Sequence, residues 1–286
     1  MGMKSRWEKC IRIVDKYEVG CNILPITAIV VTYNEDEHLR ECLNALSFCE
    51  QTIVADLGSE DRSVEIAEDV GATVIHHEHE PIAARVRSSV VERAQTEWVL
   101  FMDPDEVCHP ALAEKATRII RNSGRPIGKL FFPWKFYAWG TPLLGTRWGG
   151  KTHKGVLVHT ARTRITDDYL RCKKLLSGYE SVHVPWGNPD HCIHHYWFDS
   201  FGELLEKHLR YVEEEGEQRY KAGARFKGWG HWLWRILWQF KHCYIDERGW
   251  RDGIVGLFLS LFWAWFQGAS GLSLRRYQQK VEKRDK

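Results

Sequence analysis

Apolar runs and polar segments alternate along the first third of the chain. Four short apolar runs, rich in β-branched or aromatic residues, predict strands at residues 26–32, 52–55, 73–76 and 98–102. The segments between them predict helices at about 34–46, 61–70 and 82–94. Strands and helices that alternate with short connections are typical of an α/β fold, here a Rossmann-like and mostly parallel sheet.

Polar side chains follow three of the predicted strands at the points where these strands end. The segment Thr32–Glu35 follows the first strand, Asp56 follows the second, and Asp103-Pro104-Asp105 follows the fourth. Ligands of such sheets bind beyond the carboxyl ends of the strands, so we expect these residues to line one pocket.

Asp103 and Asp105 form the sharpest chemical signal in the chain. Two carboxylates two residues apart can bind a hard divalent cation together with a ribose hydroxyl. Such a cation would neutralise a diphosphate and stabilise it as a leaving group. An acidic pair in a turn can equally cap the next helix, but the position directly after a buried strand favours the cation site.

Three other residues fit the same chemistry. The ring of Tyr33 can stack on a nucleobase, and the carboxylate of Asp56 can accept a hydrogen bond from a base N–H group. Arg87, on the helix before the fourth strand, can pair with a diphosphate or with Asp103. Each also has a structural interpretation, namely a surface aromatic, a turn-forming aspartate and a solvent-facing arginine.

Three segments resemble a known family: Ile-Val-Val-Thr-Tyr-Asn-Glu at 29–35, Val-Ala-Asp-Leu-Gly-Ser-Glu-Asp-Arg-Ser at 54–63, and Trp-Val-Leu-Phe-Met-Asp-Pro-Asp-Glu at 98–106. Together they resemble family 2 glycosyltransferases with the GT-A fold, above all the branch that contains lipopolysaccharide-core β-glucosyltransferases. The resemblance is close over about residues 26–106 and loose to about residue 200. It departs at Leu57, where the family usually has Ser, and at Ser88, where an Asn is frequent.

The resemblance implies an inverting, metal-dependent glycosyltransferase that uses a nucleotide sugar, with a UDP-sugar as the expected donor, and Mg²⁺ or Mn²⁺ as the cofactor. The donor site would consist of Thr32, Tyr33, Asn34, Glu35, Asp56, Arg87 and Asp103, and the metal site of Asp103, Asp105 and His195. The acceptor would be a glycolipid or lipid-linked saccharide of the cell envelope, as in lipopolysaccharide-core synthesis.

An inverting transfer also needs a base that takes a proton from the acceptor hydroxyl. Enzymes that resemble this chain often have a His-Glu pair in the second lobe for this purpose, whereas this chain has His183-Val184. Glu180 is the first candidate for the catalytic base and Asp190 the second. Either residue can equally be a structural or surface carboxylate. The nearby histidines and Cys192 match no spacing of a closed zinc site.

The sequence predicts three regions. Residues 1–24 form an N-terminal extension, and residues 25–198 form the GT-A catalytic domain, with a nucleotide-binding half at 25–106 and an acceptor half at 107–198. Residues 199–286 form a helical region that is expected to contact a membrane. Half of the 14 Trp residues lie at or beyond Trp229, and indole rings prefer the boundary between lipid and water.

The way in which this C-terminal region meets the membrane is less constrained. Residues 253–274 carry no charge, which is about the length of a membrane span. A span would place the basic end of the chain outside the cytosol, against the positive-inside rule, so an in-plane or re-entrant segment is favoured. Trp229, Trp232, Trp234 and Trp238, with Arg235 and Lys241, are expected to form an interfacial helix. A buried helix pair or an oligomer contact is the alternative.

Bulk properties narrow the compartment and the partners. A net charge of +2 does not favour nucleic acid as a partner. The eight cysteines are scattered singly, and residues 1–10 carry charges where a secretory signal would be apolar. We therefore expect the cysteines to be free thiols and the protein to lie at the cytoplasmic face of a membrane. Two other functions stay open: a polyprenyl-phosphate glycosyltransferase, and an inactive nucleotide-binding scaffold on the membrane.

Overall fold

The computed structural model describes residues 23–80, 83–166, 173–198 and 200–284. The chain divides into two compact units. Unit 1 comprises residues 1–135 and 151–196, and unit 2 comprises residues 136–150 and 197–286. Unit 2 therefore includes a segment, 136–150, that the sequence assigned to the acceptor half of the catalytic domain. Most of the predicted N-terminal extension lies outside the described residues.

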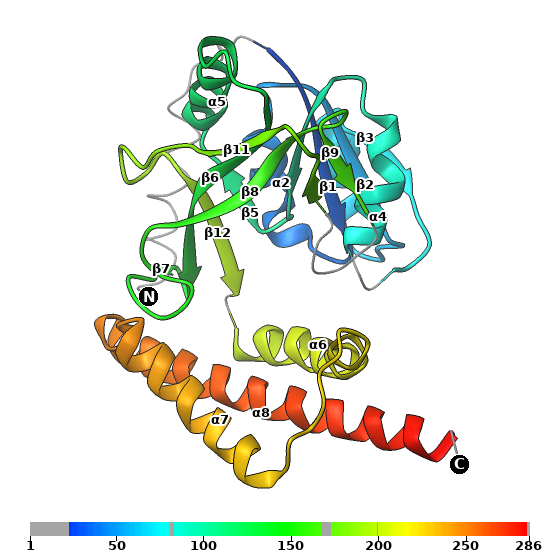
Figure 1. Cartoon of the computed structure of the whole chain (residues 1–286). Helices are drawn as coiled ribbons and strands as arrows, with labels where there is room; N and C mark the ends of the chain where they lie inside the picture. The colour runs from blue at the N-terminus through cyan, green and yellow to red at the C-terminus, as the bar shows by residue number, and fades with distance from the viewer. Residues whose placement is uncertain (1–22, 81–82, 167–172, 199, 285–286) are drawn as a thin grey trace. The chain divides into compact units, whose positions relative to one another are not determined.

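Unit 1 begins with the predicted parallel sheet. Its strands are β1 (Leu24–Thr32), β2 (Cys49–Asp56), β3 (Thr73–His76) and β4 (Trp98–Met102), in the order β3-β2-β1-β4 (Figure 1). The intervening segments form α2 (Asp36–Asn44), α3 (Ser63–Asp69), α4 (Ala83–Val90) and the short 3₁₀ helix η1 (Val91–Arg93). The predicted α/β fold class is confirmed.

The central strand β1 is apolar along its length because both of its faces are covered. Ala28 and Val30 pack in one cluster with Leu39 of α2, whereas Ile29 and Val31 pack in a second cluster with Val86 and Val90 of α4. Alternate residues of a strand point to opposite faces, so a continuous apolar run is what a strand between two helical layers requires.

The described residues between 106 and 198 add further, mostly antiparallel, strands to the same sheet. The chain continues through β5 (Glu106–Cys108), α5 (Pro110–Asn122), β6 (Ile127–Ala138), β7 (Thr141–Pro142), β8 (Thr152–His159), β11 (Glu180–His183) and β12 (Ile193–Phe198). The sheet runs on from β4 in the order β8-β6-β12-β5, while β9 (Thr163–Ile165) and β10 (Lys173–Leu175) form a separate pair. The mixed sheet beyond a parallel half is the GT-A arrangement that the resemblance implies.

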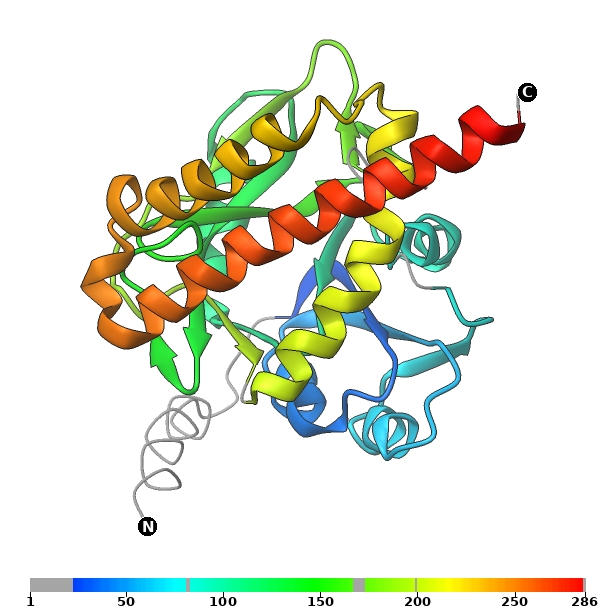
Figure 2. The ribbon, with the colours of Figure 1, turned by 90° about the horizontal axis from the view of Figure 1, so that it is seen from below.

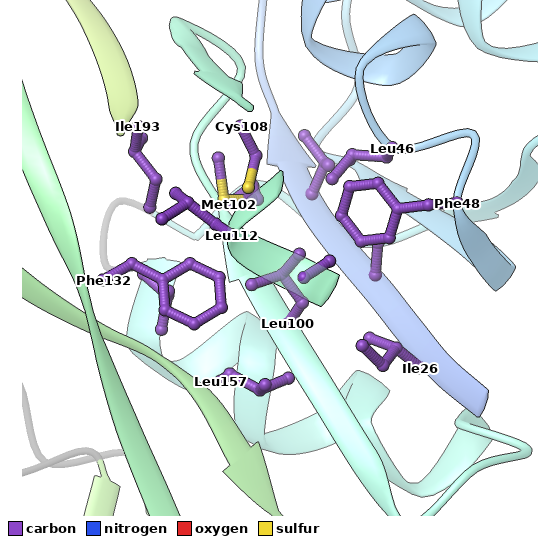
Figure 3. Packing of buried hydrophobic residues seen from close by; sticks show 14 of the residues in the cluster. Ile26, Leu46, Phe48, Leu100, Met102, Cys108, Leu112, Phe132, Leu157 and Ile193 are labelled. Atoms are coloured by element: carbon purple, nitrogen blue, oxygen red, sulfur yellow. The ribbon is translucent and has the colours of Figure 1, made fainter. Parts of the chain in front are cut away.

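The larger of the two apolar clusters joins the parallel and antiparallel halves. Figure 3 shows Leu100 and Met102 of β4 among Phe132 of β6, Leu157 of β8 and Ile193 of β12. Phe132 and Leu157 are fully buried. This packing fixes β4, and hence the acidic turn that follows it, against the strands from the second half of the unit.

Unit 2 is built on three long helices. They are α6 (Phe201–Lys221), α7 (Trp229–Lys241) and α8 (Gly253–Arg284), with the π-helical turn η2 (His242–Asp246) and the 3₁₀ turn η3 (Gly249–Asp252) between α7 and α8. Both α6 and α7 pack along α8 (Figures 1 and 2). Asp252 accepts hydrogen bonds from the backbone N–H groups of Leu144 and Gly145, at 2.7 and 2.9 Å, and so joins residues 136–150 to this unit.

Candidate active site

The acidic turn after β4 places Asp103 between two cations. Its Oδ2 lies 2.5 Å from the Nζ of Lys154 in β8, and its Oδ1 contacts the guanidinium of Arg87 in α4. Arg87 thus reaches one of the two partners that the sequence suggested for it. Burial alone would raise the pKa of Asp103, but the Lys154 and Arg87 charges outweigh burial and hold this pKa well below its ordinary value. Asp103 is therefore a carboxylate with both oxygens engaged.

The side chain of Glu106, the first residue of β5, stabilises the turn. It is fully buried, and its Oε1 accepts hydrogen bonds from Lys154 Nζ at 2.6 Å and from Trp134 Nε1 at 2.8 Å. Its Oε2 accepts a hydrogen bond from the backbone N–H of Asp103 at 3.1 Å. One ammonium group therefore joins Glu106 to Asp103, and the two carboxylates fix the start and the end of the turn.

Lys154, Glu106 and Trp134 are site residues that the sequence analysis missed. Two signals could have pointed to them. Glu106 directly follows Asp-Pro-Asp, and Lys154 is the third residue of a strand that then runs Gly-Val-Leu-Val into the core. A strand lysine beside an acidic turn is a natural counter-ion for it.

Asp105 and His195 meet on the other side of the turn. The Nε2 of His195 lies 3.2 Å from the Oδ2 of Asp105, and both side chains are about nine-tenths buried. Strand β12 pairs with β5 so that His195 lies opposite Glu106, and its ring stacks on Trp134 with centroids 5.3 Å apart. The predicted metal residues Asp105 and His195 are thus together, whereas Asp103 is held by its two cations.

This pair fits a divalent cation by its chemistry. A carboxylate oxygen and an imidazole nitrogen are donors that Mn²⁺ accepts, and Mg²⁺ accepts the carboxylate. Among the described residues, no group of three or more His, Cys, Asp or Glu side chains converges on one point. A cation held by Asp105 and His195 would therefore need further oxygen ligands from water or from a phosphate.

The predicted donor loops lie together at the carboxyl ends of β1 and β2. Asn34 has a left-handed backbone with φ of 52°. Its N–H donates to Ser59 Oγ at 2.9 Å and its Oδ1 accepts from Glu60 N–H at 2.7 Å. The Leu57 N–H donates to the Thr32 carbonyl at 3.0 Å. These bonds bring the segment Thr32–Glu35 and the loop after Asp56 into one surface.

Asp56 and Tyr33 occupy different environments in this surface. Asp56 is buried, and its carboxylate accepts hydrogen bonds from the backbone N–H groups of Gly58 and Ser59, each at 3.1 Å. It therefore shapes its own loop, as a turn-forming aspartate does. Tyr33 is 37% exposed, and its ring lies 4.5 Å from that of His79. Of the two, Tyr33 is the residue with an accessible face for stacking.

The structure does not bring Glu180 to the acidic turn. Glu180 pairs with Ile127 at the start of β6 and forms an exposed ion pair with Arg125. Lys154, which contacts the turn, pairs with Phe132. Five residues of strand separate these two levels, or roughly 16 Å at about 3.3 Å per residue.

Asp190 also lies apart from the turn, on the loop before β12. Its side chain is 61% exposed and lies 3.6 Å from Lys135 Nζ. Its backbone carbonyl accepts a hydrogen bond from His194 Nε2 at 3.0 Å. In this structure both proposed bases are surface carboxylates with a basic partner, so a role in catalysis stays a prediction for each.

Comparison with known sequences identifies the domain that carries this site. Residues 27–140 match the sequence model of Glycosyl transferase family 2. These residues belong to glycosyltransferase family 2. The matched span includes the donor loops, Arg87 and the turn at 103–106, while Lys154 and His195 lie beyond it.

Individual relatives match this chain only in part. A putative glycosyltransferase, EpsH of Bacillus subtilis, is 32% identical over 104 residues, which are 32% of this chain and 29% of EpsH. The lipopolysaccharide core biosynthesis glycosyltransferase LpsC of Rhizobium meliloti is 26% identical over 110 residues, 37% of this chain and 40% of LpsC. The chain thus spans less than half the length of either relative. A solved structure of glucosyl-3-phosphoglycerate synthase from Mycobacterium tuberculosis also matches, with 14% identity and a TM-score of 0.46. The match covers 74% of this chain and 87% of the synthase chain.

Proposed function

We propose that this family 2 glycosyltransferase transfers a sugar from a nucleotide-sugar donor, with a UDP-sugar expected, to a glycolipid or lipid-linked saccharide of the cell envelope. The observation that carries the proposal is the buried Asp105–His195 pair beside a charge-balanced Asp103, at the carboxyl edge of a family 2 domain. The likeness to LpsC, named for lipopolysaccharide core biosynthesis, supports the class of acceptor. The reaction takes place at the cytoplasmic face of a membrane.

Different residues would bind the donor and the cofactor. Asp105 and His195 would hold Mn²⁺ or Mg²⁺, and the bound cation would supply charge neutralisation to a departing diphosphate. Tyr33 offers a face to the nucleobase, and the loop after Asp56 offers backbone groups. Asp103, fixed by Arg87 and Lys154, presents a carboxylate edge to a ribose hydroxyl. The acceptor proton passes to a general base, for which Glu180 and Asp190 stay the predicted residues.

The experiment that tests this proposal is donor binding measured by thermal shift. UDP-, GDP-, TDP- and CMP-sugars are compared with and without Mn²⁺. We expect one nucleotide to raise the melting temperature in a Mn²⁺-dependent way. Asp105→Asn and His195→Gln should remove the Mn²⁺-dependent part, while Glu114→Gln, an exposed carboxylate on α5, should retain it.

Transfer is then measured with the selected donor on two acceptors, an envelope glycolipid extract and a polyprenyl phosphate. Product on the glycolipid supports the proposal, and product on the polyprenyl phosphate alone would replace it with the other transferase. Donor binding without transfer to either acceptor and without donor hydrolysis would identify an inactive scaffold. A folded protein that binds no nucleotide sugar in the presence of Mn²⁺ would refute the donor site.

A further inference from the structure

Helix α7 carries large apolar side chains on the side that faces away from α8. We call this set the outer face of α7, and it consists of Leu233, Trp234, Leu237 and Trp238. These four side chains are between 41 and 61% exposed. Trp229 is not included because Arg275 of α8 lies over its ring, 4.4 Å from the ring centroid. Spacings of four residues place them on one side of the helix. A surface helix ordinarily presents polar residues to water, so this face has the composition of a contact surface.

The opposite side of α7 is already occupied by α8. Trp232 Nε1 donates to the Gly268 carbonyl at 2.9 Å, and Arg235 donates to Gln267 Oε1 at 2.9 Å. Trp232 and Arg235 therefore contact α8, whereas the interfacial role expected for the helix as a whole stays a prediction. Trp229, Trp234 and Trp238 stay exposed, as that expectation requires.

Helix α8 is the segment whose length and composition would suit a membrane span, yet it packs within unit 2. The candidate span covers residues 249–284, and half of its most apolar window is buried. Helices α6 and α7 both pack along it, and buried positions such as Leu259, Phe262 and Phe266 lie on its covered sides. Protein contacts thus explain the buried apolar side chains of α8, although Ile254, Leu261 and Trp265 of this helix are exposed. They do not explain the outer face of α7.

Basic residues flank the outer face of α7 at both ends. Residues 222–245 contain no Asp or Glu. The exposed cations Arg225 and Lys227 precede the helix. At the other end Lys241, Arg248 and Arg251 are accompanied by Asp246, Glu247 and Asp252, and Lys241 is paired with Asp246. The excess of positive charge beside the apolar face therefore lies at the start of α7.

We propose that the outer face of α7 binds the surface of a bilayer that contains anionic lipids, with α7 lying in the plane of the membrane. The indole and leucine side chains would enter the boundary of the acyl region, and the flanking cations would contact the headgroups.

Binding of the full chain to sedimented vesicles tests the proposal. The wild type is compared on phosphatidylcholine vesicles and on vesicles that also contain phosphatidylglycerol, and we expect tighter binding to the second kind. The variant W234S/W238S should bind at least about 30-fold more weakly than the wild type, because each indole contributes a large buried area. Leu209→Ser, which removes an exposed leucine of α6, is the matched control and should bind as the wild type does.

A second variant separates the electrostatic contribution. Lys227→Gln with Arg251→Gln should reduce the preference for phosphatidylglycerol and the sensitivity to salt, while binding to phosphatidylcholine persists. Circular dichroism and donor-induced thermal shift establish that each variant is folded. The proposal is overturned if the wild type binds neither vesicle, or if W234S/W238S binds both as well as the wild type does. It is also overturned if light scattering shows a wild-type dimer that W234S/W238S converts to a monomer.

Discussion

Replacing Lys154 by Met should destabilise unit 1 strongly, because one ammonium group neutralises two carboxylates. Lys154 Nζ lies 2.5 Å from Asp103 Oδ2 and 2.6 Å from Glu106 Oε1, and its side chain is 16% exposed. After the substitution Asp103 keeps Arg87, but Glu106 keeps only its two neutral donors, Trp134 Nε1 and the Asp103 N–H. A charge left in the interior without its counter-ion costs about 3–5 kcal/mol.

The remaining donors of Glu106 reduce that cost, so we take its lower limit of about 3 kcal/mol. In a unit of this size such a loss lowers the melting temperature by roughly 6–12 °C. Thermal unfolding of the metal-free protein, followed by circular dichroism, measures the change. Lys151→Met removes the same charge from an exposed position and should stay within about 0.5 kcal/mol of the wild type.

The double variant tests whether the cost arises from the Lys154–Glu106 contact itself. Glu106→Gln removes the charge that Lys154→Met leaves behind, so K154M/E106Q should be more stable than the sum of the two single changes predicts. A coupling of at least about 1 kcal/mol is expected for groups in direct contact. Additive changes, or a Lys154→Met protein as stable as the Lys151→Met control, would refute the idea that this ammonium balances the acidic turn.

Two further predictions concern packing and pH. Gly216→Ala, which would stabilise an isolated helix, should destabilise unit 2 by about 2 kcal/mol in urea unfolding. The added Cβ would meet the backbone of α8, at 2.5 Å from Ser273 C and 2.8 Å from Leu274 N, and an unchanged midpoint would contradict that close approach. Burial and the neighbouring His191 lower the pKa of His109 from 6.5 to about 4, so its stabilising contribution is complete above pH 6.5 and is lost as pH falls towards 4. His109→Asn keeps an acceptor for the Ala111 N–H and should lose about 2 kcal/mol less than the wild type between pH 7 and pH 4; parallel losses in the two proteins would exclude His109 as the titrating group.

The parallel half of the sheet was predictable above all because its central strands, β1 and β4, are covered on both faces. The predicted strands 73–76 and 98–102 coincide with β3 and β4, and 26–32 differs from β1 only at its start. A continuous apolar run is a local property of the sequence, and so is the polar residue that ends it. The same locality made Asp56, Asp103 and Asp105 predictable as residues at strand ends.

The partners of these residues were less predictable because they come from distant segments. Lys154 reaches Asp103 only because β8 pairs antiparallel with β4, and His195 reaches Asp105 only through the register of β12 on β5. Register depends on which faces are buried and on the turns between strands. Residues 129–184 are rich in aromatic residues and glycines without a regular alternation, so their sequence determines neither. Glu180 was favoured as the base because it is a carboxylate after the Asp-x-Asp turn. The register of β11 on β6 instead places it opposite Ile127, at the end of β6 that is distant from the turn.

Helix α7 is a second case in which contacts with a distant segment cannot be predicted from the local sequence. Its sequence, Trp-Gly-His-Trp-Leu-Trp-Arg-Ile-Leu-Trp-Gln-Phe-Lys, is apolar on both sides, so periodicity alone cannot say which indoles are packed. The answer lies in α8, where Gly268 and Gly271 leave room for Ile236 and Trp232. Small residues more than 30 positions away in the sequence therefore decide that Trp232 is structural and that Trp234 and Trp238 are available to a partner. A pair of larger residues at 268 and 271 would push α7 away from α8, and the exposed surface would then be a different one.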